Sequence, residues 1–137
     1  MISFQSDGVA IPNLDFGKVT RWLTEVAAGY DRRIGELTYM FCSDEIILKS
    51  NREFLGHDYY TDIITFDYTI GDKVGADLLI SLDTVRSNAE QLGVSYDDEL
   101  HRVIVHGLLH LCGIEDKTPE ARREMEAAEN AALKLLK

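Results

Sequence analysis

The segment from His106 to Asp116, HGLLHLCGIED, constrains the fold of this chain more than any other, because it requires a helix followed at once by a chain reversal. Residues four apart lie on one face of a helix, so His106 and His110 can bind one metal ion together. Gly113 can end the helix in the left-handed conformation, and the reversed chain then brings Asp116 back toward both imidazoles. The spacing therefore predicts a metal site made of His106, His110 and Asp116.

Three protein ligands leave the fourth position of a tetrahedral metal open, which is typical of catalytic rather than structural zinc sites. A metal held in this way can lower the pKa of a bound water or polarise a substrate oxygen, so hydrolysis is the natural reaction class. Zinc peptidases with the HExxH motif use the glutamate after the first histidine as general base, but Gly107 occupies that place here. Glu115 is the candidate base near the motif, and a solvated acid in an exposed turn is the alternative.

Two neighbours of the motif, His101 and Cys112, belong to residue types that bind metals in other proteins. His101 precedes His106 by five residues and is turned by about 140° around the helix, so we expect a solvated or locally paired imidazole. Cys112 is turned by about 200° from His110, so we expect a small buried hydrophobic residue. Neither residue is predicted to be a fourth ligand.

Alternating and helical hydrophobic patterns follow one another along the chain. We expect strands at 1–5, 33–41, 61–68 and 75–81, and helices at 14–29, from 44 to about 54, from 82 to about 91, from 97 or 98 through the motif, and from 119 onward. A turn at 71–73 can join its flanking strands as an antiparallel hairpin. The predicted fold is an α+β sandwich: a mixed, mostly parallel sheet with one antiparallel edge strand, and helices packed against it. The metal site is expected on the helix that carries the HxxxH motif, at the edge of the sheet.

Size and composition fit one domain spanning 1–137, because a chain of this length can bury a single sizeable core. No apolar run approaches the ~20 residues of a membrane helix, and the start of the chain lacks the order of a signal peptide. Cys42 and Cys112 are far apart in sequence, which predicts no disulfide framework and suits a reducing cytoplasm. The net charge of −10 disfavours indiscriminate binding of nucleic acid, so such a role requires a local basic patch.

The motif resembles the signature of the YbeY family of metal-dependent endoribonucleases, whose pattern is His-Gly-x-Leu-His-Leu-x-Gly-Tyr-Asp-His. The segment 51–66, which ends in TDIITF, is similar to the family's block Asn-x-x-Tyr-Arg…Thr-Asp-Val-Leu-Ser-Phe. The segment 75–81, GADLLIS, resembles the family's Gly-Asp-Ile strand, and Glu124, Met125 and Glu129 fit its last helix. The resemblance covers most of the chain from about residue 36 onward.

This resemblance implies a cytoplasmic, single-strand-specific endoribonuclease that acts in late maturation of the 16S ribosomal RNA 3′ end and in ribosome quality control. It implies one Zn²⁺ per chain and no organic cofactor. The expected partners are ribosomal RNA and the small ribosomal subunit, with no membrane. The alternative is a ribosome-associated factor that binds RNA or protein and whose metal is mainly structural.

Two positions depart from the family pattern. The third metal histidine of the family falls on Asp116, whose harder oxygen ligand can shift metal choice from zinc toward another divalent ion. The arginine of the family block falls on Leu55, which cannot hold a phosphate. Arg52 and His57 lie close to Leu55 in sequence, so they are the candidates for the missing RNA contact.

Overall fold

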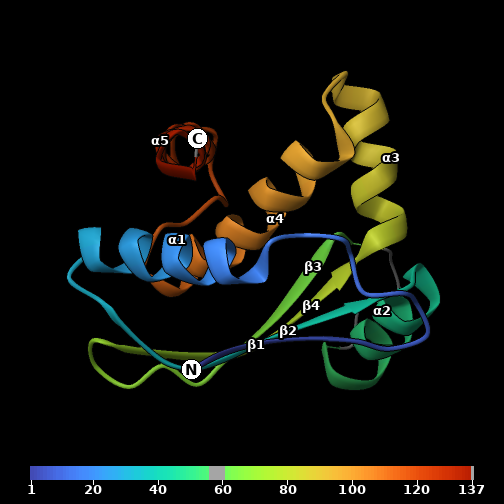
Figure 1. Cartoon of the computed structure of the whole chain (residues 1–137), viewed down its shortest axis with the longest axis horizontal. Helices are drawn as coiled ribbons and strands as arrows, with labels where there is room; N and C mark the ends of the chain where they lie inside the picture. The colour runs from blue at the N-terminus through green and yellow to red at the C-terminus, as the bar shows by residue number, and fades with distance from the viewer. Residues whose placement is uncertain (56–60, 137) are drawn as a thin grey trace.

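A computed structural model describes residues 1–55 and 61–136, with the helices and strands arranged as in Figure 1. The strands are β1 (Ile2–Ser6), β2 (Arg33–Cys42), β3 (Ile63–Asp67) and β4 (Lys73–Ser81). The helices are α1 (Phe16–Gly29), α2 (Asp44–Ser50), α3 (Leu82–Leu92), α4 (Tyr96–Leu111) and α5 (Pro119–Leu136), and a π-helical turn, η1 (Asn51–Leu55), continues α2. The predicted α+β class is confirmed.

The four strands form one sheet in the order β1-β2-β4-β3. β1 pairs with β2 in parallel, and β2 pairs with β4 in parallel. β3 lies at the edge and runs antiparallel to β4, with Ile64 opposite Leu79. The sheet is therefore mostly parallel with one antiparallel edge strand, as the sequence predicts.

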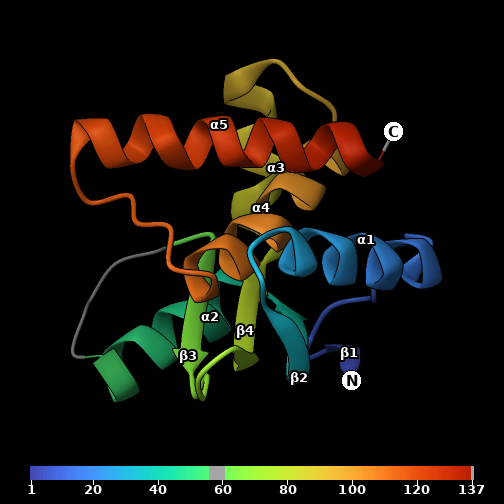
Figure 2. The same cartoon turned by 90° about the vertical axis from the view of Figure 1, so that its left-hand side faces the viewer.

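Side-chain alternation in the strands gives the sheet two apolar faces. Val74, Ala76, Leu78 and Ile80 of β4 belong to the large core, which also contains residues of α1, α3, α4 and α5. On the opposite face Leu79 packs with Ile47 of α2 in a smaller cluster. Helix α5 packs on α1 and α4 and lies farther from the sheet, as Figure 2 shows. The sheet thus separates α2 from the helices that build the site.

Serine side chains begin three of the helices by accepting a hydrogen bond from the first turn. Ser43 and Ser81 cap α2 and α3 in this way. Ser95 accepts from the Asp98 backbone N–H, so α4 begins at Tyr96, slightly before the expected start at 97 or 98. The helix expected to run from 44 to about 54 changes to π-helical winding at Asn51.

The apolar stripe around the motif histidines is buried and belongs to the core. Its members are Leu100, Val103, Ile104, Leu108 and Leu111. Both cysteines are free and buried, and burial raises the pKa of the Cys112 thiol to about 11, as expected for a small core residue. In the part of the chain that the structure describes, no helix is long and apolar enough to span a membrane.

Candidate metal centre

Helix α4 carries both motif histidines and lies directly on the sheet at Gly107. A Cβ built on Gly107 would come within 2.4 Å of Leu78 Cδ2 and 2.8 Å of Ile63 Cδ1. Any side chain at this position would force Leu78 or Ile63 to shift, so the helix approaches β4 and the edge strand β3 closely. Gly107 therefore lacks both a base and the room for one, which strengthens the argument against the HExxH peptidase arrangement.

The chain reverses immediately after α4, as the glycine predicts. Gly113 has a φ of 99°, in the region that residues with side chains avoid. Its N–H donates to the His110 carbonyl at 3.0 Å, and the Ile114 N–H donates to the Leu109 carbonyl at 3.1 Å. These bonds satisfy carbonyls at the helix end and turn the chain so that Asp116 returns to the face of α4 that carries the histidines.

Three donor atoms converge where Asp116 returns. Asp116 Oδ2 lies 3.5 Å from His106 Nε2 and 3.2 Å from His110 Nε2. The two imidazole rings are nearly perpendicular, with an interplanar angle of 86° and centroids 4.6 Å apart. All three side chains are half-buried, and their ligand atoms lie within 4.8 Å of one another.

This donor set fits a divalent metal ion. Two ligands held at about 2.0–2.1 Å in tetrahedral geometry are roughly 3.3 Å apart, close to both distances from Asp116 Oδ2. Two imidazole nitrogens and one carboxylate oxygen are also a common ligand set of zinc in proteins. His106, His110 and Asp116 could therefore hold a metal ion.

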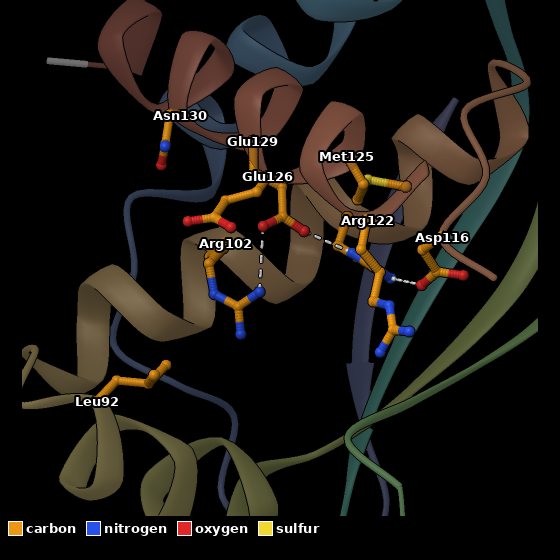
Figure 3. Close-up of a pocket in the computed structure, with 9 residues that line it drawn as sticks. Leu92, Arg102, Asp116, Arg122, Met125, Glu126, Glu129 and Asn130 are labelled. Carbon is orange, nitrogen blue, oxygen red and sulfur yellow. Dashed lines mark hydrogen bonds and ion pairs between the residues drawn. The ribbon is translucent and has the colours of Figure 1, made fainter. Parts of the chain in front are cut away.

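A series of hydrogen-bonded charged side chains contacts His106 on the side away from Asp116. His106 Nδ1 lies 2.5 Å from Glu129 Oε2, and Arg102 Nη1 donates to Glu129 Oε1 at 3.2 Å. Arg102 also donates from Nε to Glu99 Oε1 at 2.8 Å, with a second hydrogen bond to the other Glu99 oxygen. Glu99 and Glu129 are buried, and the hydrogen bonds that Arg102 donates to Glu99 are the main reason that the pKa of Arg102 is raised. Figure 3 shows Arg102, Glu129 and Asp116 along this line.

Two hollows adjoin the centre, and Asp116 lines both of them. The first, of about 450 Å³, lies between α4 and α5 and is lined by Leu92, Arg102, His106, Asp116, Arg122, Met125, Glu126, Glu129 and Asn130 (Figure 3). The second, of about 310 Å³, lies beside β3 and is lined by Thr65, Asp67, His110, Leu111, Gly113, Ile114, Glu115, Asp116 and Lys117. In each hollow the lining carboxylates outnumber the cationic side chains among the described residues.

Asp62 is a further carboxylate that interacts electrostatically with His106 and Arg102. Burial raises its pKa, while the charges of His106 and Arg102 act in the opposite direction. Asn88 Nδ2 donates to Asp62 Oδ2 at 3.3 Å. Asp62 is thus a half-buried acid immediately before the first residue of β3.

The other residues singled out by sequence lie in different places. Glu115 is exposed and lines the second hollow with Asp116, so the structure places it near the centre. Arg52 lies exposed on η1 and does not occur among the described residues that line the two hollows. His57 lies outside the described residues. His101 packs edge-on against Trp22, with centroids 5.9 Å apart, and is not part of the centre.

The sequence also contains functional candidates that the motif alone does not reveal. Glu129 shares one face of α5 with Met125 and Ala132, at positions four before and three after it, and all three are buried. A carboxylate on an apolar stripe signals a buried partner. Arg102 is four residues before His106 and therefore lies on the same face of α4. These patterns mark both residues in the sequence, but not their contact with each other.

The fold and the donor set define an α+β protein in which a helix over a mixed sheet carries a candidate three-ligand metal centre. The model of the family described as endoribonuclease YbeY matches residues 1–137. The chain belongs to the YbeY family.

Relatives and a solved structure agree with this assignment. The chain is 62% identical over 136 residues to endoribonuclease YbeY of Phocaeicola vulgatus, covering 99% of each chain. It is 60% identical over 132 residues to endoribonuclease YbeY of Bacteroides thetaiotaomicron, covering 96% of each. The solution structure of TM1509 from Thermotoga maritima matches with a TM-score of 0.70 at 23% identity, covering 99% of this chain and 89% of that one, and it shows the same fold.

Proposed function

We propose that this chain is a cytoplasmic, metal-dependent endoribonuclease that cuts single-stranded RNA during late maturation of the 16S ribosomal RNA 3′ end and in ribosome quality control. Its substrate is ribosomal RNA, and its partner is the small ribosomal subunit. The observation that supports this most is the convergence of His106 Nε2, His110 Nε2 and Asp116 Oδ2 in a member of the YbeY family. The proposed cofactor is one Zn²⁺, with another divalent ion as the alternative because Asp116 supplies an oxygen.

The roles of the chain's own residues follow from their positions. His106, His110 and Asp116 would hold the ion, and the ion would supply Lewis acidity to the hydrolysis. Glu115 is the candidate general base, because its exposed carboxylate lines the hollow that contains His110 and Asp116.

Two cations that line the hollows beside the centre support contact with the RNA backbone. Arg122 lines the hollow that contains His106, and Lys117 lines the hollow that contains His110. A chain of phosphates crossing the ion would therefore meet one basic side chain on each side. Arg52 and His57 remain candidates for an RNA contact.

The experiment is cleavage of a single-stranded ribosomal RNA fragment by purified protein. Cutting should require the metal, stop on chelation, return when zinc is added, and be lost in His110→Ala. A matched control is His101→Ala, because His101 lies outside the centre and should leave cutting intact. Equal cutting by His110→Ala would contradict the proposal and would point to a contaminating nuclease.

One observation favours the alternative, a ribosome-associated factor that binds RNA or protein with a mainly structural metal. Carboxylates outnumber cations in the lining of both hollows, and nucleic-acid sites are usually basic. This alternative predicts that metal removal unfolds the chain and that RNA is bound without being cut. The nuclease proposal predicts that the metal-free protein stays folded, because the large core is apolar and does not depend on the ion.

A further inference from the structure

We propose that Glu129 is a positioning residue of the metal centre, which fixes His106 in the tautomer that presents Nε2 to the ion. This inference rests on the proposed metal centre. It concerns a residue on α5, the helix farthest from the sheet, and it gives that helix a part in metal binding.

The geometry determines which nitrogen of His106 carries the proton. Glu129 Oε2 lies 2.5 Å from His106 Nδ1, and a carboxylate can only accept a hydrogen bond. Nδ1 must therefore be the donor, and the lone pair of the neutral ring is then on Nε2. Nε2 is the atom that faces Asp116 Oδ2, at 3.5 Å. The contact with Glu129 thus prepares the ring for a metal before one binds.

Glu129 is itself held in place by the rest of the chain. Arg102 reaches its other oxygen from α4 at 3.2 Å, and the same guanidinium is fixed to the buried Glu99 through two hydrogen bonds. The side chain of Glu129 is 5% exposed, so water cannot replace these partners. Both oxygens of Glu129 are occupied, which prevents the carboxylate from rotating away from His106.

The charges point to the same function. One guanidinium faces two buried carboxylates, Glu99 and Glu129, so this group carries an excess negative charge. Asp116 adds another on the far side of the His106 ring. A bound cation would compensate this excess of negative charge beside the two imidazoles.

A purely structural role, in which Glu129 only ties α5 to α4, makes a different prediction. In that case substitution of Glu129 would lower the stability of the metal-free protein and leave the zinc affinity of the folded protein unchanged. A positioning role changes the zinc affinity and the tautomer of His106 even when the fold is intact. The measurements are therefore the zinc dissociation constant, by competition with a chromophoric chelator, and the His106 ring nitrogens in the zinc-loaded protein, by NMR.

The test compares Glu129→Gln and Glu129→Ala with the unchanged chain. Glu129→Gln keeps the size and one acceptor oxygen but loses the charge, and its amide can also donate to Nδ1, so both tautomers become accessible. We expect Glu129→Gln to weaken zinc binding about 10- to 100-fold and Glu129→Ala to weaken it at least as much. In the unchanged chain NMR should show a protonated Nδ1 and a zinc-bound Nε2, and in Glu129→Gln this preference should be lost.

Glu124→Gln is the matched control, because it removes the same charge from an exposed position of α5. Its zinc affinity should stay within about twofold of the unchanged chain, since exposed charges contribute little. Wild-type zinc affinity and an unchanged His106 tautomer in Glu129→Gln would overturn the inference, whether or not Glu129→Ala folds. Failure of the unchanged chain to bind zinc or another divalent ion would instead contradict the metal centre itself, and with it the proposed function.

Discussion

At the scale of single residues, the arrangement of the centre depends on two glycines. Gly107 lets α4 approach the sheet, and Gly113 reverses the chain so that Asp116 returns to His106 and His110. Asp116 stands where the family signature has a histidine, yet its Oδ2 lies 3.2 Å and 3.5 Å from the two imidazoles. The substitution changes the chemistry of the third ligand and keeps its place.

Substitution of Gly107 tests the close approach of α4. We expect Gly107→Ala to lower the free energy of unfolding by about 1–3 kcal/mol, because the added methyl group overlaps Leu78 and Ile63 in a packed core. Urea denaturation measures this loss. Gly29→Ala is the control, since a Cβ at Gly29 meets nothing within 4 Å and its cost should be near zero. Equal effects of the two substitutions would show that α4 can shift away from the sheet.

Asp62 gives the protein a pH dependence of stability with a defined sign. Burial raises the pKa of Asp62, so the native state holds this proton more tightly than the unfolded chain does. Ionisation then costs stability, and this cost is absent below the unfolded pKa of about 3.9 and complete above the raised native pKa.

We therefore expect Asp62→Asn to be more stable than the unchanged chain at pH 7 and equally stable near pH 3. Urea denaturation across this range measures the difference, which should grow as the pH rises. Asp31→Asn, which removes an exposed carboxylate, should show no such trend. A difference for Asp62→Asn that stays constant with pH would contradict the account.

At the scale of elements, the outermost helix, α5, is joined to the site. Its buried Glu129 meets Arg102 of α4, which also binds Glu99 one turn earlier on the same helix. Trp22 of α1 donates from Nε1 to the Ala132 carbonyl of α5 at 2.7 Å, so α5 is held on two sides. Helix α5 therefore has a fixed position over the centre.

Removal of the Arg102 guanidinium should destabilise the fold, because it leaves two buried carboxylates without a counter-charge. We expect Arg102→Met to lower the free energy of unfolding of the metal-free protein by about 3 kcal/mol, because Glu99 and Glu129 lose their counter-charge. Adding Glu99→Gln to this variant should restore part of the loss. Arg33→Met is the control: Arg33 pairs with Asp72 on an exposed surface, where a pair contributes roughly 0–1 kcal/mol. A loss no larger than that of the control would show that water replaces Arg102.

At the scale of the whole molecule, the fold class and the convergence of three candidate ligands were accessible from the sequence for physical reasons. Strand alternation, capping serines and the turn at 71–73 act locally, so they predict the elements and the antiparallel edge strand. The helix spacing and Gly113 act within one turn, so they predict the convergence of His106, His110 and Asp116. Local sequence patterns are therefore sufficient to predict the elements and the convergence of these three residues.

Contacts between distant elements were not accessible in the same way. The pairing of Glu129 with His106 joins residues 23 positions apart, on helices whose relative placement depends on the packed core. The change to π-helical winding at Asn51 also lacks a local signal in the sequence. The lining of the two hollows depends on how α5 and β3 flank α4, so Arg122 and Lys117 could not be assigned from spacing.

The sheet and four helices share one core. We therefore propose that the chain is a single domain that unfolds in one step. The large cluster contains residues of α1, α3, α4, α5, β2 and β4. Trp22 is the single tryptophan, so its fluorescence reports the contact of α1 with α5, whereas circular dichroism reports all helices. The two signals should give the same midpoint in urea. A lower midpoint for fluorescence would mean that α5 detaches first.

The most direct test of the central claim, an open three-ligand metal centre on α4, is a crystal structure of the metal-loaded protein. We expect His106 Nε2, His110 Nε2 and a carboxylate oxygen of Asp116 at about 2.0–2.2 Å from the ion, with water or another small ligand in the remaining position. A fourth protein side chain closing the coordination sphere would contradict it and would favour a structural metal. An ion bound without Asp116 would contradict it as well.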